Sequence, residues 1–409
     1  MQAIANETNV VLKDLRARLN TEDPFFRDTT LNLYLRTGYI FTENPDGTRS
    51  QTWAGGSTLF YESGYLRDWL QIGATVLSAQ PIFAPADEGG TLLLTNDQDQ
   101  MTTLGLAYGR MRVLNQELTV GRQQIETPYV NPRDNRMVPI TFEGVVLRPR
   151  HDMVETIDYM TGYLWRYKPR QSSVFESFSE GLGAEQDRGL LINGVKVGAS
   201  EGLTFGAIDY WISDTLNTAY AEFDWLSPSS THDLTYRFVL NYTDQRSVGK
   251  QLIKGAPYST FQISGRIAVS LGALTLRTAF STNSDDAPIR SPFGSPPGHT
   301  ALNDFNFERA GEDAIVFGAD YDLSVVVTDG LKVRIEYGQG KDAVDPATGL
   351  PLPDRSELDL SLRYRPTSGP LENFDLRLDY CTLVRHDGGT PRRRDPFVGV
   401  IFTYRVPLL

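Results

Sequence analysis

The chain has 409 residues and carries a formal net charge of -12 at pH 7. So acidic a chain offers no basic face to pair with phosphates, which excludes nucleic acid as a partner. Its only cysteine, Cys381, excludes an internal disulfide bond and the structural zinc sites that are built on cysteine pairs.

Residues 1–28 differ in pattern from the rest of the chain. Apolar residues recur at helical spacing in 10–19, and the dipeptide Asp23-Pro24 breaks that spacing. We therefore expect an amino-terminal tail or a short helix over 1–28. A single domain over 29–409 follows, because no linker interrupts the remaining sequence.

From Thr29 to the end, apolar and polar residues alternate with a period of two. In residues 234–242, for example, every second residue is Leu, Tyr or Phe. Successive side chains of a strand point to opposite faces, so each strand has one apolar face and one polar face. The pattern predicts eighteen strands, at 29–41, 53–65, 67–79, 101–113, 116–125, 141–149, 153–168, 189–199, 202–213, 216–227, 232–246, 257–270, 273–283, 313–328, 330–341, 355–367, 371–385 and 394–407.

The lengths of these strands and of their connections indicate a membrane protein. Most of the strands exceed the usual length in soluble sheets, about five or six residues, and are long enough to cross a bilayer obliquely. Connections after even-numbered strands are short, whereas most after odd-numbered strands are long, as at 125–141 and 283–313. An even strand number with this sorting of connections is typical of bacterial outer-membrane barrels. Because an open edge would leave backbone groups unpaired in lipid, the first strand must pair with the last.

The predicted fold is all-β, a transmembrane antiparallel β-barrel with short periplasmic turns and long external loops. Residues 1–28 would then lie in the periplasm. The start of the sequence lacks the basic segment and apolar core of a signal peptide, so we expect that a signal peptide has been removed. Tyr159, Tyr163 and Trp165 share one face of a predicted strand, which fits an interfacial girdle, with ordinary core aromatics as the alternative.

A set of arginines alternates with apolar neighbours inside the predicted strands. On the lipid face at mid-depth each would cost about 2–4 kcal/mol, so we expect them to line the pore. These residues are Arg36, Arg166, Arg237, Arg266, Arg277, Arg334, Arg363, Arg377 and Arg405. Asp and Glu residues share the same face. The arginines therefore either pair with these acids and brace the wall, or guide an anionic group along the pore.

Residues 118–144 contain the most specific pattern. Gly121-Arg122-Gln123 ends one predicted strand, Thr127-Pro128 and Asn131 follow in the connection, and Thr141-Phe142 opens the next strand. In these residues the chain resembles the OprD family of outer-membrane porins. The resemblance implies that this third external loop folds into the barrel and narrows it. The residues that would line the constriction are Tyr129, Asn131, Arg133, Asp134 and Arg136.

The resemblance also implies a monomeric or loosely trimeric channel for small molecules, often ones that carry a carboxylate. We therefore expect an outer-membrane porin for passive uptake of small polar solutes, with a carboxylate-bearing molecule as the solute, guided by lumenal arginines through the loop constriction. An exporter channel for an acidic polysaccharide is the alternative. The other expected partner is the lipid and lipopolysaccharide of the outer membrane.

No enzyme or cofactor site is expected. Residues 198–202 match the G-x-S-x-G pattern of hydrolases, but they lie at a strand-to-strand turn, whereas that motif needs a strand-to-helix elbow. The four histidines are scattered through turns and loops without metal-ligand spacing, so we expect no metal ligands among them.

Overall fold

The computed structural model describes residues 10–43, 47–150, 156–198, 202–227, 234–253, 257–387, 390–393 and 396–409. Strands dominate this part of the chain. The helices are α1 (Lys13–Leu19) and α2 (Pro24–Arg27), and the 3-10 turns are η2 (Glu180–Leu182) and η3 (Leu323–Val325). No described helix is long and apolar enough to span a membrane. The strands are β1 Thr30–Glu43, β2 Arg49–Glu62, β3 Leu70–Phe83, β4 Met101–Val113, β5 Gln116–Gln123, β6 Thr141–Pro149, β7 Ile157–Lys168, β8 Leu190–Gly198, β9 Gly202–Ile212, β10 Leu216–Leu226, β11 Leu234–Ser247, β12 Ser259–Leu271, β13 Leu274–Asn283, β14 Asp313–Asp322, β15 Leu331–Lys341, β16 Asp354–Tyr364, β17 Phe374–Asp387, β18 Thr390–Arg393 and β19 Phe397–Pro407.

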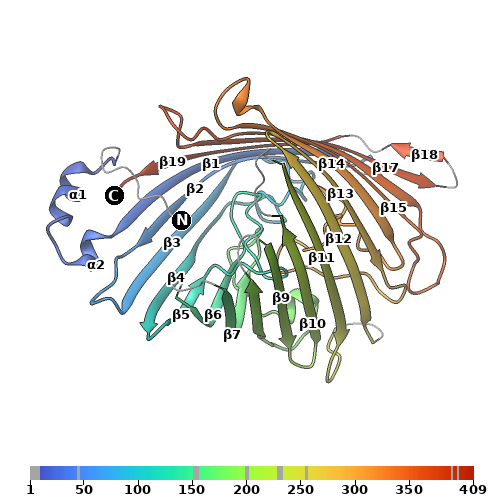
Figure 1. Ribbon diagram of the computed structural model, residues 1–409, viewed down its shortest axis with the longest axis horizontal. Coiled ribbons are helices and arrows are strands. Elements are labelled where there is room, and N and C mark those ends of the chain that lie inside the picture. The colour runs from blue at the N-terminus through green and yellow to red at the C-terminus, as the bar shows by residue number, and fades with distance from the viewer. Residues whose placement is uncertain are drawn as a thin grey trace.

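All of these strands belong to one antiparallel sheet that closes on itself (Figure 1). Each strand from β1 to β17 pairs with the next strand in sequence, and β1 also pairs with β19, with Leu33 opposite Val406 and Arg36 opposite Thr403. The wall has eighteen strands, because the short β18 pairs with the end of β17 while β19 pairs with the rest of it. Closure leaves no open edge in the lipid. The predicted eighteen-strand barrel is confirmed.

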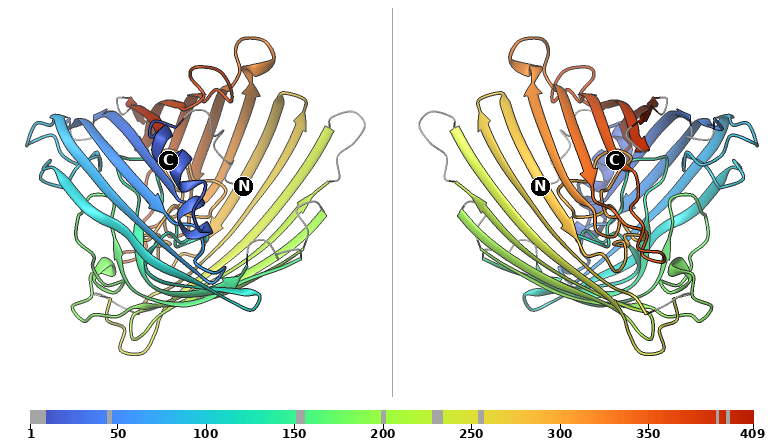
Figure 2. Two further views of the ribbon diagram at one scale, coloured as in Figure 1. Left: turned by 90° about the vertical axis from the view of Figure 1, so that its left-hand side faces the viewer. Right: turned by 90° about the vertical axis from the view of Figure 1, so that its right-hand side faces the viewer.

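The strands run obliquely around the wall (Figure 2), and their side chains alternate between two environments. On β11 the side chains of Tyr236, Leu240 and Tyr242 are exposed on the outside, whereas Val239 and Asn241 between them are buried. Large apolar side chains are exposed in the same way on most other wall strands. They form the surface that lipid covers.

A register shift interrupts the alternation between β6 and β7. Gly144 lies opposite Leu164 while Glu143 lies opposite Arg166, so Trp165 is an extra residue on β7. Such a bulge changes which face the following side chains occupy. The face of Arg166 therefore does not follow from a count along the strand, and the shared face of Tyr163 and Trp165 stays a prediction.

The amino-terminal arm, residues 10–28, is fixed to the end of the barrel where the short turns lie, here called the short-turn end. The backbone N–H of Val11 donates to Pro407 O at 3.0 Å, and that of Leu12 to Leu408 O at 3.1 Å. Gly64, in the turn after β2, donates to Phe25 O at 2.9 Å. Helices α1 and α2 thus lie beside the carboxyl terminus (Figure 1). The periplasmic location of the arm stays a prediction.

Candidate functional site

The loop between β5 and β6, residues 124–140, crosses the interior of the barrel. Gly121 at its approach has a φ of +113°, and a Cβ there would lie 2.3 Å from Ala107 O, so only glycine fits. Inside, the Tyr129 hydroxyl donates to Thr243 Oγ1 on β11 at 2.9 Å. Its ring packs edge-on against Tyr210, with 6.0 Å between centroids. The buried tyrosine therefore fastens the loop to the far wall rather than facing open space.

A second long loop, between β13 and β14 (residues 284–312), meets the β5–β6 loop. The Asn131 backbone N–H donates to Phe293 O at 3.2 Å. Its side-chain amide donates to Ser295 O at 3.2 Å and accepts from Ser295 N at 2.8 Å. Gly294 lies so close that a Cβ would come 2.6 Å from Asn131 Nδ2. These contacts hold the β5–β6 and β13–β14 loops together.

The charged residues of the β5–β6 loop have different surroundings. Asp134 makes a two-pronged ion pair with Arg36 of β1, at 2.5 and 3.2 Å. Arg136 donates from Nε to Thr91 O at 3.0 Å, and burial lowers the pKa of this guanidinium to about 10. Burial also lowers the pKa of Arg133, whose Nη1 lies 3.5 Å from Gly294 O. The side chains of Asp134 and Arg133 border a cavity, whereas the side chain of Arg136 donates to a backbone carbonyl group.

Two cavities lie on either side of this loop. The inner cavity, about 950 Å³, is bordered by wall strands, by the arm and by Leu409, so it opens toward the short-turn end. The outer cavity, about 630 Å³, is bordered by both long loops and by β10. Gln124 and Asp134 border both cavities. The two spaces therefore meet at these two side chains.

The cavities differ in charge. The outer cavity has three acidic side chains and one arginine on its wall: Glu126, Asp134, Glu222 and Arg133. The inner cavity has four arginines and two aspartates: Arg16, Arg27, Arg36, Arg405, Asp28 and Asp134. A solute that crosses the barrel by this route would pass from an acidic space into a basic one. Sequence reasoning missed Gln124, Glu126, Glu222 and Arg16, since nothing local in the sequence brings them to one space.

The nine arginines expected to line the pore fall into distinct groups. Arg36 and Arg405 border the inner cavity. Five others pair with carboxylates on their own strand or at most two strands away: Arg237 with Asp224, Arg277 with Asp320 and Glu336, Arg334 with Asp320, Arg363 with Asp375, and Arg377 with Asp379. Arg266 has a buried Nε for which the described residues offer no acceptor. Arg166 is exposed beyond the bulge. Five of the nine arginines are therefore in ion pairs that can brace the wall.

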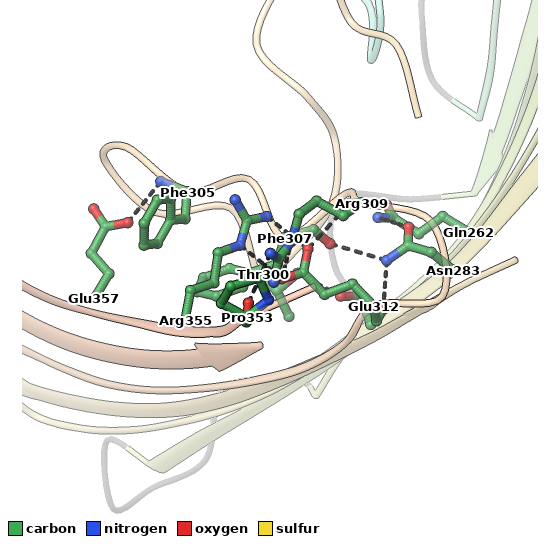
Figure 3. A network of polar contacts seen from close by, with 11 residues as sticks. Gln262, Asn283, Thr300, Phe305, Phe307, Arg309, Glu312, Pro353, Arg355 and Glu357 are labelled. Atoms are coloured by element: carbon green, nitrogen blue, oxygen red, sulfur yellow. Dashed lines mark hydrogen bonds and ion pairs between the residues drawn. The ribbon is translucent and has the colours of Figure 1, made fainter. Parts of the chain in front are cut away.

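A buried polar network holds the β13–β14 loop against the wall (Figure 3). The fully buried carboxylate of Glu312 accepts hydrogen bonds from Arg355 on β16 and from Arg309. Nearby, Glu357 accepts from the backbone N–H of Asp304 at 2.8 Å and of Phe305 at 2.7 Å. Glu312 of the loop and Glu357 of the wall thus fix the course of the loop.

One group of potential metal ligands occurs among the described residues, namely Glu357, Asp359 and Cys381, with donor atoms within 4.8 Å of one another. Both oxygens of Glu357 already accept backbone N–H groups, and Asp359 accepts from Asn303 N at 3.0 Å. The two acids therefore anchor the β13–β14 loop, while Asp359 Oδ1 has no hydrogen-bond partner among the described residues.

Comparison with known proteins agrees with this architecture. The family model described as outer membrane porin, OprD family, matches residues 23–408. None of the curated proteins matches the sequence. Among solved structures, OccK9 (OpdG) of Pseudomonas aeruginosa is 22% identical with a TM-score of 0.83, over 94% of this chain and 100% of that chain.

Two further porins have the same fold. OpdK of Pseudomonas aeruginosa, solved with vanillate, is 21% identical with a TM-score of 0.80, over 93% of this chain and 99% of that one. A BenF-like porin from Pseudomonas fluorescens Pf-5 is 18% identical with a TM-score of 0.82, over 94% and 100%. The match of the family model over nearly the whole length shows that this chain belongs to the OprD family of outer-membrane porins, and it is thus a passive channel of the bacterial outer membrane rather than an enzyme.

Proposed function

We propose that this porin takes up small polar solutes that carry a carboxylate. The charge of the inner cavity is the observation that carries the proposal, since four arginines face two aspartates there. A guanidinium is a planar fork that matches the two oxygens of a carboxylate, and in a space of low dielectric its attraction for an anion is strong. The solved complex of OpdK with vanillate, itself a carboxylate, is consistent with this solute class.

The route that we propose runs from the outer cavity past Gln124 and Asp134 into the inner cavity. Arg36 would act at the narrow point as the partner of Asp134, and Arg405 further in. Among the residues that the structure describes, Arg133 is the one cation on the wall of the outer cavity. In this scheme Tyr129, Asn131 and Arg136 shape the constriction by holding the loop, since their polar groups are engaged by the protein.

Two features favour a compact solute over the alternative, a long acidic polysaccharide. The β5–β6 loop is fastened at Tyr129 to the wall, and Asn131 ties it to the β13–β14 loop. A polymer would need both loops to move aside along its whole passage. We propose a monomer or a loose trimer as the working unit, as in our reading of the sequence.

Single-channel recording in a planar bilayer tests the solute class. A gradient of potassium chloride gives the ion preference from the reversal potential, and sodium benzoate then serves as the carboxylate probe. We expect benzoate to interrupt the current in brief events, because it occupies the arginine-lined cavity. An open channel that benzoate leaves unchanged from either side of the bilayer would overturn the proposal.

A further inference from the structure

We propose that the amino-terminal arm carries a carboxylate-binding site at the short-turn end of the pore, with Arg16 of the arm and Arg405 of β19 as its cations. The site is distinct from the loop constriction, and its ligand is a small carboxylate. The inference rests on the proposed solute class, and it adds a second position at which the solute is held before it leaves the barrel.

The arm borders the solute path. The wall of the inner cavity includes Arg16 and Asn20 of the arm together with Thr75, Leu77 and Leu106 of strands β3 and β4. A segment outside the barrel wall therefore shares one space with residues of the barrel interior. Any solute that crosses the inner cavity toward the short-turn end passes this segment.

The arm is held firmly enough to position a charged group. Two backbone hydrogen bonds join Val11 and Leu12 to the end of the chain, and Val10 is buried. The guanidinium of Arg16 donates from Nη1 to Arg27 O at 2.7 Å and from Nη2 to Thr29 O at 2.5 Å. Two fixed acceptors orient this side chain without neutralising its charge, because carbonyl oxygens carry none.

Arg16 and Arg405 differ from the other arginines of this cavity in their partners. Arg27 pairs with Asp28 at 2.9 Å, and Arg36 pairs with Asp134. Arg405 donates from Nε to the amide oxygen of Asn32 at 3.0 Å. Within the described part of the chain, no carboxylate forms an ion pair with Arg16 or Arg405.

These two guanidinium groups have donors to spare. A guanidinium has five N–H groups, of which Arg16 uses two and Arg405 uses one in the contacts above. A small carboxylate would supply both the missing countercharge and acceptors of matching geometry. One cation comes from the start of the chain and the other from its last strand, so the site exists only while the arm is docked.

The test uses the full-length porin in planar bilayers, with sodium benzoate added to one side at a time. We compare wild type with Arg16→Gln and Arg405→Gln, and with Arg18→Gln as the matched control. Arg18 lies on the same helix, is exposed, and does not border the cavity. The loss of one charge-assisted hydrogen bond should shorten the residence of benzoate about tenfold in the first two variants and leave it unchanged in the control.

Heat-dependent gel mobility verifies that each variant folds, and Arg16→Lys, which keeps the charge, should restore part of the residence time. If Arg16→Gln and Arg405→Gln hold benzoate as wild type does while Arg36→Gln shortens its residence, the arm site is overturned and carboxylate uptake stands. If benzoate never perturbs the wild-type current, the proposed solute class itself fails.

Discussion

Both carboxylate oxygens of Glu312 accept hydrogen bonds of 2.7 Å from the guanidinium of Arg355. Glu312 ends the β13–β14 loop and is fully buried, while Arg355 lies on β16. Burial alone would raise the pKa of Glu312, but the hydrogen bonds from Arg355 and Arg309 outweigh it and the pKa is lowered. The pair is therefore charged, and it ties the loop that frames the outer cavity to the wall (Figure 3).

Glu312→Gln should destabilise the barrel strongly. The amide keeps the shape of the carboxylate but leaves two guanidinium groups near it without a countercharge, and breaking a buried ion pair from one side costs about 3–5 kcal/mol. Urea unfolding in lipid vesicles measures the loss, and open-channel current noise should rise as the loop loosens. The control is Asp313→Asn at the adjacent exposed position. Equal unfolding curves for the two variants would contradict this role of Glu312.

Asn131→Ala should separate the two long loops and widen the channel. It removes both side-chain hydrogen bonds to Ser295 and leaves the Ser295 N–H without its acceptor, at a cost of about 1–3 kcal/mol. The measurement is single-channel conductance, which should increase.

Gly294→Ala supplies a second route to the same effect, because its Cβ would collide with the Asn131 amide. In the Asn131→Ala background that collision disappears, so Gly294→Ala should then change the conductance little. Additive effects of the two substitutions would show that they act at separate places.

The wall of this barrel was predictable, whereas the composition of its cavities was not. Water on one face and lipid on the other impose strict alternation, so that Tyr236 and Leu240 could be placed from spacing alone. The same spacing could not assign a face to Arg166, because the bulge at Trp165 adds an unpaired residue that hydrophobic periodicity does not reveal.

The candidate site depends on contacts between distant segments. Asn131 and Asp134 were found through a family pattern, but Glu222 reaches the same cavity from β10 and Arg16 reaches the inner one from the arm. A helical pattern in residues 10–19 predicts a helix, and it carries no information on the surface where that helix docks. Glu312 was missed for the same reason, since its partner Arg355 lies beyond two intervening strands.

Arg36 and Asp134 should shift the ion preference in opposite directions. Asp134→Asn removes the negative member of the pair at the junction of the two cavities, which leaves Arg36 free to attract anions, so the reversal potential should move toward anion preference. Arg36→Gln should move it toward cation preference. Arg363→Gln, which breaks the pair with Asp375 elsewhere on the wall, serves as the control and should change it less. Shifts of one sign in both variants would mean that the pair does not set the local charge.

Glu308 should make the β13–β14 loop sensitive to pH. The side chain is 7% exposed, and burial raises its pKa from 4.5 to about 8. Because the folded protein binds this proton more tightly than the unfolded chain, the stabilisation is complete below pH 4.5 and is lost as the pH rises through about 8. We therefore expect the urea midpoint of wild type to fall between pH 5 and pH 9, and open-channel noise to rise over the same range.

Glu308→Gln isolates this effect, because an amide of the same shape stays neutral at every pH. Its urea midpoint should fall less than that of wild type between pH 5 and pH 9, and its current noise should rise less. Asp313→Asn, at an exposed position of the same region, should retain the full wild-type dependence. If Glu308→Gln instead follows the wild-type curve across the whole range, the proton is held elsewhere, and the loop must owe its pH response to another buried group.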